Sequence, residues 1–198
     1  METTQVIAPP AERRRITVAE FAAMYQAGIL SEDEHLELIN GELITMAAMD
    51  APHASHVARL SRLFIESLSK KAVIYTQLPI VLGEYSEPEP DVAVLRWRED
   101  DYCSGKPTAK DVLLVVEVAD RSLLYDRETK LPLYAQYGIT EVWILNLQAK
   151  QVEVYRNPQG SAYQEKQIFK PSDDLAMQAF PDLQFPVSEM FIAPKEHK

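Results

Sequence analysis

The sequence predicts an α/β (α+β) fold in which a mixed β-sheet is flanked by helices. Three observations lead to this prediction. The predicted segments follow the order helix, hairpin, helix, several strands, helix and further strands. Two runs, "DVLLVVEV" and "TEVWILNL", are apolar almost without alternation, which is typical of strands buried on both faces. The segment "HASHVARLSRLFIESLSKK" carries apolar residues at helical spacing, so it can cover a sheet with one buried stripe.

The N-terminal part of the chain contains strong local signals. Residues 1–15 are polar and include "APPAE", so we expect a disordered lead. A helix is predicted over "TVAEFAAMYQAG", because Thr17 and Glu20 have capping-box spacing and Gly28 can end the helix. Asn40-Gly41 within "HLELINGELITM" is a two-residue hairpin signal between apolar arms.

The middle of the chain changes from a helical pattern to strands. The stripe of the second helix is formed by Val57, Leu60, Phe64 and Leu68. Three short β-branched runs follow, "AVIYTQ", "PIVLGE" and "DVAVLRW", and each is predicted to be a strand. We interpret "EDDYCSGKPTAKD" as the loop that leads to the buried strand "DVLLVVEV".

The C-terminal part is predicted to add a helix and a hairpin to the sheet. After a loop, "ADRSLLYD", the segment "RETKLPLYAQYG" is expected to be a helix that ends before Gly138 and tolerates Pro132 only in its first turn. "KQVEVYR" and "SAYQEKQIF" form a predicted hairpin around the turn "NPQG". The tail "FPDLQFPVSEMF" is expected to be irregular. With no repeat and no linker, residues 16–193 form one predicted domain.

Composition limits the classes of function. The 198 residues carry a net charge of −10, which argues against tight non-specific binding to nucleic acid but not against a nuclease with an acidic metal site. Two basic clusters, at Arg13–Arg15 and along the second helix, are interpreted as solvated surface. Cys103 is the only cysteine, so an internal disulfide and a cysteine zinc cluster are excluded and a cytoplasmic setting is expected. No apolar run approaches the roughly 20 residues of a membrane helix.

Two carboxylates interrupt the predicted strands. Asp91 opens "DVAVL" and Glu117 lies near the end of "LLVVEV". If these strands are neighbours, the two acids meet at one end of the sheet, where they repel each other unless a proton or a cation intervenes. Carboxylate oxygens on a rigid sheet suit magnesium. Lys130, at the predicted start of the third helix, could orient water or stabilise negative charge, and Glu37 on the first hairpin is a candidate fourth member.

Each of these residues has a structural alternative. Lys130 could be an ordinary surface lysine, and Glu37 could face solvent because its strand alternates. Asp91 could cap a turn after Pro90, and Glu117 could form a salt bridge to Arg121 or Lys130. Glu42 competes with Glu37 for the same role, since the two lie on either side of the hairpin turn.

Other polar and aromatic residues receive structural interpretations. His53 and His56 could bind zinc, but no further ligand follows at a known spacing, so polar contacts at the helix start are the favoured reading. Asp126 is predicted to cap the third helix. Trp97, Trp143 and Tyr134 are predicted to pack in the core.

Four segments together carry a family resemblance: "LELINGELITM", "PEPD", "VVEV" and "YDRETKLPLYAQYGITEVWILN". In this order they resemble the bacterial Uma-two family of restriction endonucleases, within the PD-(D/E)XK nuclease superfamily. The similarity extends from Ile16 to about Phe191 and implies a restriction-endonuclease-like core. It also implies that Asp91 and Glu117 bind the metal.

The resemblance assigns further roles and shows one departure. The usual lysine position of the superfamily, two residues after the second acid, is Ala119 here, and Lys130 from the following helix matches the lysine of this family. Glu37 matches an early glutamate at the metal site. His53 matches a recurring histidine that would contact phosphate or the outer shell of the metal.

These expectations combine into a functional prediction. The chain is predicted to be a magnesium-dependent endodeoxyribonuclease, with manganese as an alternative ion, that hydrolyses DNA phosphodiester bonds as a homodimer. Two other functions stay open. One is a catalytically inactive DNA-binding or regulatory module with a nuclease fold, and the other is a metal-dependent hydrolase of small phosphoesters.

Overall fold

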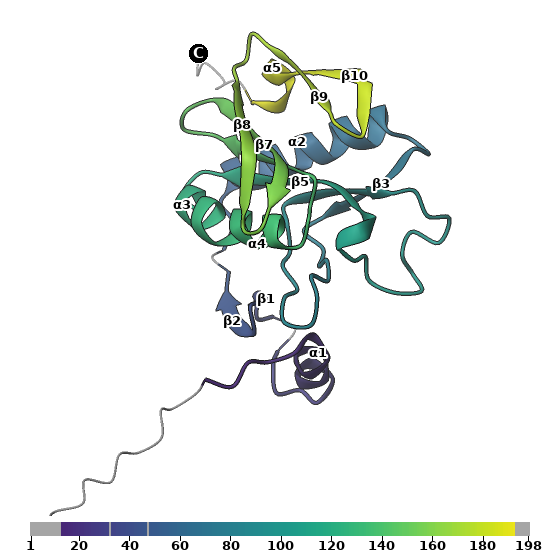
Figure 1. Cartoon of the computed structure of the whole chain (residues 1–198), viewed down its shortest axis with the longest axis vertical. Helices are drawn as coiled ribbons and strands as arrows, with labels where there is room; N and C mark the ends of the chain where they lie inside the picture. The colour runs from purple at the N-terminus through teal and green to yellow at the C-terminus, as the bar shows by residue number, and fades with distance from the viewer. Residues whose placement is uncertain (1–12, 32, 47, 193–198) are drawn as a thin grey trace, which may run out of the picture.

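A six-stranded mixed sheet forms the centre of the protein (Figure 1). The computed structural model describes residues 13–31, 33–46 and 48–192. The strands lie in the order β3-β4-β5-β6-β7-β8, and only β5 and β6 are parallel. Their bounds are β3 Ala72–Thr76, β4 Val92–Arg96, β5 Val112–Ala119, β6 Glu141–Asn146, β7 Gln151–Gln159 and β8 Ala162–Phe169. The predicted mixed sheet is confirmed.

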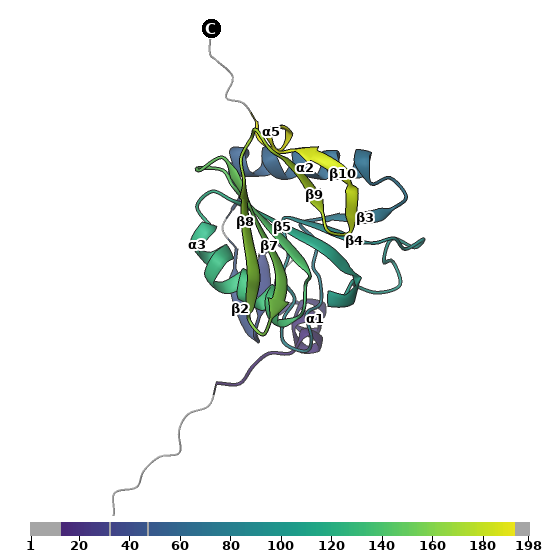
Figure 2. The ribbon, with the colours of Figure 1, turned by 45° about the horizontal axis from the view of Figure 1, so that its top comes forward.

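Both faces of the sheet are covered, as Figure 2 shows. Helix α2 (Ala51–Ser67) lies on one face beside the hairpin β9 (Asp174–Met177) and β10 (Phe180–Pro186) and the short helix α5 (Val187–Met190). The predicted stripe of α2 is buried there, and Phe64 packs edge-on against Trp143 of β6 with ring centroids 6.0 Å apart. Burial on both faces explains why β5 and β6 are apolar almost throughout.

The N-terminal elements follow their local signals. Helix α1 (Val18–Gln26) begins at a complete capping box, since Glu20 N donates to Thr17 Oγ1 and Thr17 N donates to the Glu20 side chain. The strands β1 (Leu36–Ile39) and β2 (Glu42–Thr45) pair antiparallel around Asn40 and Gly41. Both turn residues have positive φ, 52° and 82°, as a two-residue hairpin of this kind requires.

The predicted lead of residues 1–15 lies mostly outside the described residues, which begin at Arg13. Arg15 is in contact with the fold. Its guanidinium group lies 3.9 Å from the centroid of the Tyr85 ring, and its Nε donates to the Asn40 carbonyl at 2.8 Å. The rest of the predicted lead, residues 1–12, lies outside the described residues.

The connection from β5 to β6 differs from the prediction. The segment expected to be a loop already contains helix α3 (Leu123–Tyr125), which continues through a π-helical turn (Asp126–Lys130) into α4 (Leu131–Gln136). In the wide turn, Leu131 N bonds to the Asp126 carbonyl, five residues back. Pro132 lacks an N–H and crowds the preceding turn, and the wider turn accommodates its ring without a break.

Two further expectations about this segment were wrong. Lys130 lies in the middle of the helical segment and not at its start. Asp126 does not cap the helix. It is buried within the helix, and its Oδ2 accepts a hydrogen bond from the Ser122 hydroxyl at 2.7 Å.

Three other segments also differ from the prediction. "PIVLGE" forms no strand, because residues 77–90 leave the sheet and turn toward β1, where Glu87 forms an isolated bridge with Leu38. Within "PIVLGE", Val81 forms an isolated bridge with Thr108. The tail is regular where irregular structure was expected, since β10 pairs with β9. Strand β7 continues through Pro158, so the turn lies one step later, at Gly160.

Trp97, expected in the core, is 49% exposed, whereas Trp143 and Tyr134 are fully buried as predicted. No helix of the described segments is both long and apolar enough to cross a membrane.

Candidate active site

Asp91 and Glu117 lie side by side because their strands are neighbours. Strands β4 and β5 pair antiparallel with Val92 opposite Val116, so the residue before β4 is adjacent to Glu117. Asp91 N lies 3.4 Å from Glu117 Oε2, and Asp91 Oδ2 accepts a hydrogen bond from Val118 N at 2.8 Å. The predicted meeting of the two acids at one end of the sheet is confirmed.

Lys130 extends into this cluster from the helix that crosses from β5 to β6. Its Nζ lies 3.4 Å from Glu117 Oε1 and 2.9 Å from Glu37 Oε1. The side chain is only 3% exposed. Burial by itself lowers the pKa of Lys130, but Glu117, Glu37 and Asp91 together raise it above its ordinary value. The lysine is therefore a fixed positive charge among carboxylates.

Glu37, and not Glu42, joins the cluster. Glu37 Oε1 also accepts a hydrogen bond from Glu89 N at 2.8 Å, so β1 is tied to the segment that leads into Asp91. Glu42 lies beyond the turn with a side chain that is 61% exposed, and it pairs with Arg13. Within the described part of the chain, Glu37 Oε2 is buried and has no hydrogen-bond partner.

His53 completes the partly open side of the cluster. Asp50 caps α2 by accepting from His53 N at 3.0 Å, which fixes the histidine in the first turn. His53 Nε2 lies 2.9 Å from Asp91 Oδ1, and this hydrogen bond raises the pKa of His53 above its ordinary value, while burial opposes the shift. His56 faces Phe191 and the Pro52 carbonyl instead, so the two histidines do not converge on a zinc ion.

Three further residues lie at the site but were not predicted from the sequence to belong to it. The Tyr134 hydroxyl donates to Glu117 Oε1 at 2.5 Å. Burial raises the pKa of Asp126 to about 6. The Tyr125 hydroxyl is buried without a partner among the residues described. A signal was present for two of them, since Asp126, Lys130 and Tyr134 are spaced by four and share one helical face.

The site contains more negative than positive charge. Four carboxyl groups, those of Glu37, Asp91, Glu117 and Asp126, surround one lysine and one histidine. Burial raises the pKa of Glu117 to about 8, and Lys130 opposes this shift while Asp91 adds to it. A carboxyl group that is buried next to a second carboxylate needs either a proton or further positive charge nearby.

The donor set fits a hard divalent cation in its chemistry. Carboxylate oxygens from Asp91, Glu117 and Glu37 are the ligands that magnesium prefers, and the buried Glu37 Oε2 is an unused acceptor. In the described segments, however, no three acidic, histidine or cysteine side chains stand ready at ligand spacing. Lys130 lies between Glu37 and Glu117, so binding an ion requires local rearrangement of these side chains. Asp91 and His53, 14% and 17% exposed, are the members most open to solvent.

Fold and site together define the class of restriction-endonuclease-like proteins, in which acids at the ends of neighbouring strands meet a lysine. The chain belongs to the Uma2 family, described as "Putative restriction endonuclease", whose model matches residues 18–188. A solved structure from Anabaena variabilis ATCC 29413, described as "a putative nuclease belonging to DUF820", has the same fold. It is 20% identical, with a TM-score of 0.67 over 89% of this chain and 97% of that chain. Among curated proteins, none matches this chain.

Proposed function

We propose that the protein is a metal-dependent endodeoxyribonuclease that hydrolyses DNA phosphodiester bonds by a PD-(D/E)XK-type mechanism. One observation carries the proposal: four residues from distant parts of the chain, Glu37, Asp91, Glu117 and Lys130, converge at one end of the sheet. Membership of a family described as restriction endonucleases supports the same reaction. DNA is the proposed substrate, and a homodimer is the proposed assembly.

Each residue has a proposed role. Asp91 and Glu117 would hold the magnesium or manganese ion, and Glu37 would help through its free oxygen. When bound, such an ion stabilises charge on a phosphoryl oxygen and lowers the pKa of water. Lys130, held as a cation, would orient the attacking water or stabilise the transition-state charge. His53 would hold Asp91 and lie toward the incoming phosphate.

The direct test combines metal binding with cleavage. We expect Asp91→Asn and Glu117→Gln to lose the heat of manganese binding in calorimetry and to lose nicking of supercoiled plasmid, while both stay folded. Glu42→Gln is the matched control, since it removes an exposed carboxylate of the neighbouring strand. Equal heats for wild type and both variants would refute the metal assignment.

A second candidate function is a DNA-binding or regulatory module without catalysis. It is favoured by one observation, the pairing of Lys130 with both Glu37 and Glu117, which compensates buried charge without an ion. Gel-shift experiments with and without chelator separate the two functions. DNA binding that persists in chelator, together with no nicking after manganese is added, would favour the module. Sedimentation analysis of the same samples tests the proposed homodimer.

A further inference from the structure

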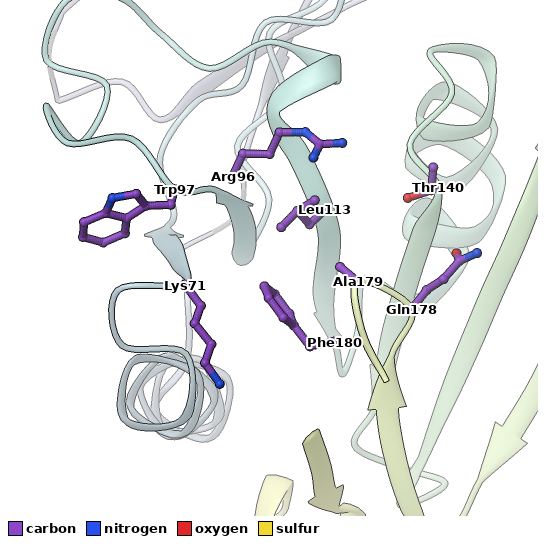
Figure 3. Close-up of a pocket in the computed structure, with 8 residues that line it drawn as sticks. All are labelled: Lys71, Arg96, Trp97, Leu113, Thr140, Gln178, Ala179 and Phe180. Carbon is purple, nitrogen blue, oxygen red and sulfur yellow. The ribbon is translucent and has the colours of Figure 1, made fainter. Parts of the chain in front are cut away.

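The hollow drawn in Figure 3 lies at the far end of β4 from the candidate active site, and its polar groups do not converge. The Trp97 indole points away from the Phe180 ring. The ammonium group of Lys71 and the guanidinium group of Arg96 point in opposite directions. No single small ligand can contact these four side chains at once, whereas the polar groups of the candidate active site surround Lys130 closely.

Two buried polar atoms of the candidate active site have no hydrogen-bond partner among the residues described. They are the hydroxyl group of Tyr125 and Oε2 of Glu37. A buried polar atom without a partner costs stability, so nearly all such atoms in folded proteins bond to protein groups or to ordered water. The hydroxyl group can donate a hydrogen bond, and the carboxylate oxygen can accept one. The two atoms therefore offer complementary partners to one small polar molecule.

The π-helical turn brings Tyr125 to the side of the helix that faces Glu37. Tyr125 precedes this turn and Lys130 ends it, five residues later. Hydrogen bonds in such a turn join residues five apart, so the two side chains project on nearly the same side. Lys130 Nζ in turn contacts Glu37 Oε1 at 2.9 Å. The electrostatics agree with this placement, since among the charged groups Glu37 has the largest effect on the pKa of Tyr125.

Both partners are held in a defined state. Burial and the charge of Glu37 raise the pKa of Tyr125 to about 12, although Lys130 opposes the rise, so the hydroxyl group keeps its proton at neutral pH. Glu37 Oε1 is bonded to Lys130 Nζ and to Glu89 N, which restricts rotation of the carboxylate and fixes the direction of Oε2. Such fixed groups can orient a water molecule before it reacts.

We propose that Tyr125 and Glu37 hold the water molecule that attacks the DNA phosphate. The Tyr125 hydroxyl bonds to the water oxygen, and Glu37 Oε2 accepts one of the water hydrogens. This inference rests on the proposed function and adds Tyr125 to its catalytic residues. It also gives Glu37 a second role, in which the carboxylate accepts a proton as well as pairing with Lys130.

The open and closed sides of the site give the attack a direction. Asp91 and His53 are the members most open to solvent, whereas Glu37 and Lys130 are buried. A phosphate that enters from the open side meets the water on the closed side, so its leaving oxygen faces solvent, in line with the attack. The water oxygen bonds to phosphorus, its proton passes to Glu37 Oε2, and the bond from phosphorus to the leaving oxygen breaks. The leaving oxygen takes a proton from solvent, and Glu37 later releases its proton to solvent.

The variant Tyr125→Phe separates catalysis from stability. Manganese-dependent nicking of plasmid should lose roughly tenfold or more in kcat, because the water loses one of its two partners, while KM stays within about twofold of wild type. Tyr163→Phe is the matched control, since its hydroxyl donates to the Ile139 carbonyl at 2.7 Å on the edge strand β8. Tyr163→Phe should keep kcat and lower the melting temperature more than Tyr125→Phe does, because it breaks a hydrogen bond within the protein.

A crystal structure of the metal-free protein tests the water site independently of cleavage. We expect an ordered water within about 3.2 Å of both Tyr125 Oη and Glu37 Oε2, and its loss in Tyr125→Phe. No water there, or a direct bond between the two side chains, overturns the proposal whether or not DNA is nicked. A kcat for Tyr125→Phe within about twofold of wild type, or a fall in kcat that only follows a fall in melting temperature, also overturns it. Water at this position in a wild-type protein that nicks no DNA would refute the hydrolysis but support the water site.

Discussion

The ammonium group of Lys130 lies 2.9 Å from Glu37 Oε1, and both side chains are almost completely buried. This ion pair joins the β1–β2 hairpin to the helical crossover between β5 and β6. Glu117 shares the same ammonium group at 3.4 Å. Stability and the candidate chemistry therefore depend on the same three side chains.

Replacing Lys130 should destabilise the protein strongly. In Lys130→Met two buried carboxylates lose their compensating charge, and breaking a buried pair in this way costs about 3–5 kcal/mol. Urea denaturation measures the free energy of unfolding. The double variant Lys130→Met/Glu37→Gln should recover part of the loss. Lys150→Met, at an exposed turn, is the control. A loss below about 1 kcal/mol for Lys130→Met would contradict a buried ion pair.

The same substitution, Glu to Gln, should have a large effect at Glu37 and almost none at Glu42. Glu37→Gln removes a buried charge that accepts from Lys130 and Glu89 N, so we expect a loss of about 1–3 kcal/mol and reduced manganese affinity. Glu42→Gln removes an exposed charge that pairs with exposed Arg13, and should change stability by less than about 0.5 kcal/mol. Parallel denaturation and calorimetry check both variants. Equal effects of the two substitutions would contradict the assignment of Glu37, and not Glu42, to the site.

Tyr134 should act as a positioning residue through Glu117. Tyr134→Phe removes the hydroxyl that donates to Glu117 Oε1 and should cost about 1 kcal/mol of stability. Burial raises the pKa of Glu117 to about 8 and the Tyr134 hydrogen bond opposes that rise, so its loss should raise this pKa further. The pH profile of manganese-dependent nicking should then move to higher pH. A purely structural role would lower activity equally at every pH.

Because of Glu153, the free energy of unfolding should fall as the pH falls into the acidic range. Burial raises the pKa of this carboxyl group, but hydrogen bonds from Arg127, Tyr155 and Lys166 outweigh burial and lower it to about 2. A lowered pKa adds stability that is present above the unfolded value of 4.5 and is lost as the pH falls toward 2. Glu153→Gln should be about 2 kcal/mol less stable at pH 7 and nearly equal to wild type at pH 2. Denaturation at several pH values checks this, and a constant difference would contradict it.

Much of the fold could be predicted because its signals are local. Asn40-Gly41 requires positive φ, the Thr17 capping box defines a helix start, and two long apolar runs fit only strands covered on both faces. The predictions of secondary structure were wrong where tertiary contacts decide the local structure. Residues 77–90 have β-branched character but turn toward β1, and the prolines of the tail hid a strand paired with β9.

The site was predictable where charge interrupts an apolar pattern. Asp91 and Glu117 stand out in this way at the ends of buried strands. Glu37 could not be separated from Glu42, because all four residues of β1 are buried and alternation therefore fails there. Tyr134 was interpreted correctly as core, but a helical aromatic does not reveal where its hydroxyl points. The π-helical turn, which sets the direction of Lys130, has no clear sequence signature.

His53 should titrate above its ordinary pKa because of Asp91. The hydrogen bond to Asp91 raises the pKa of His53 from 6.5, burial lowers it, and Asp50 and Asp126 add to the rise. Stabilisation from the charged pair is therefore complete below pH 6.5 and disappears as the pH rises through the folded pKa. NMR titration, with the His53 signal assigned by a His53→Gln variant, should give a midpoint above 6.5 that falls in Asp91→Asn. Magnesium should also lower the midpoint if Asp91 binds the ion, since the ion competes with the imidazolium. A wild-type midpoint below 6.5, or one unmoved in Asp91→Asn, would show that the pair does not form in solution.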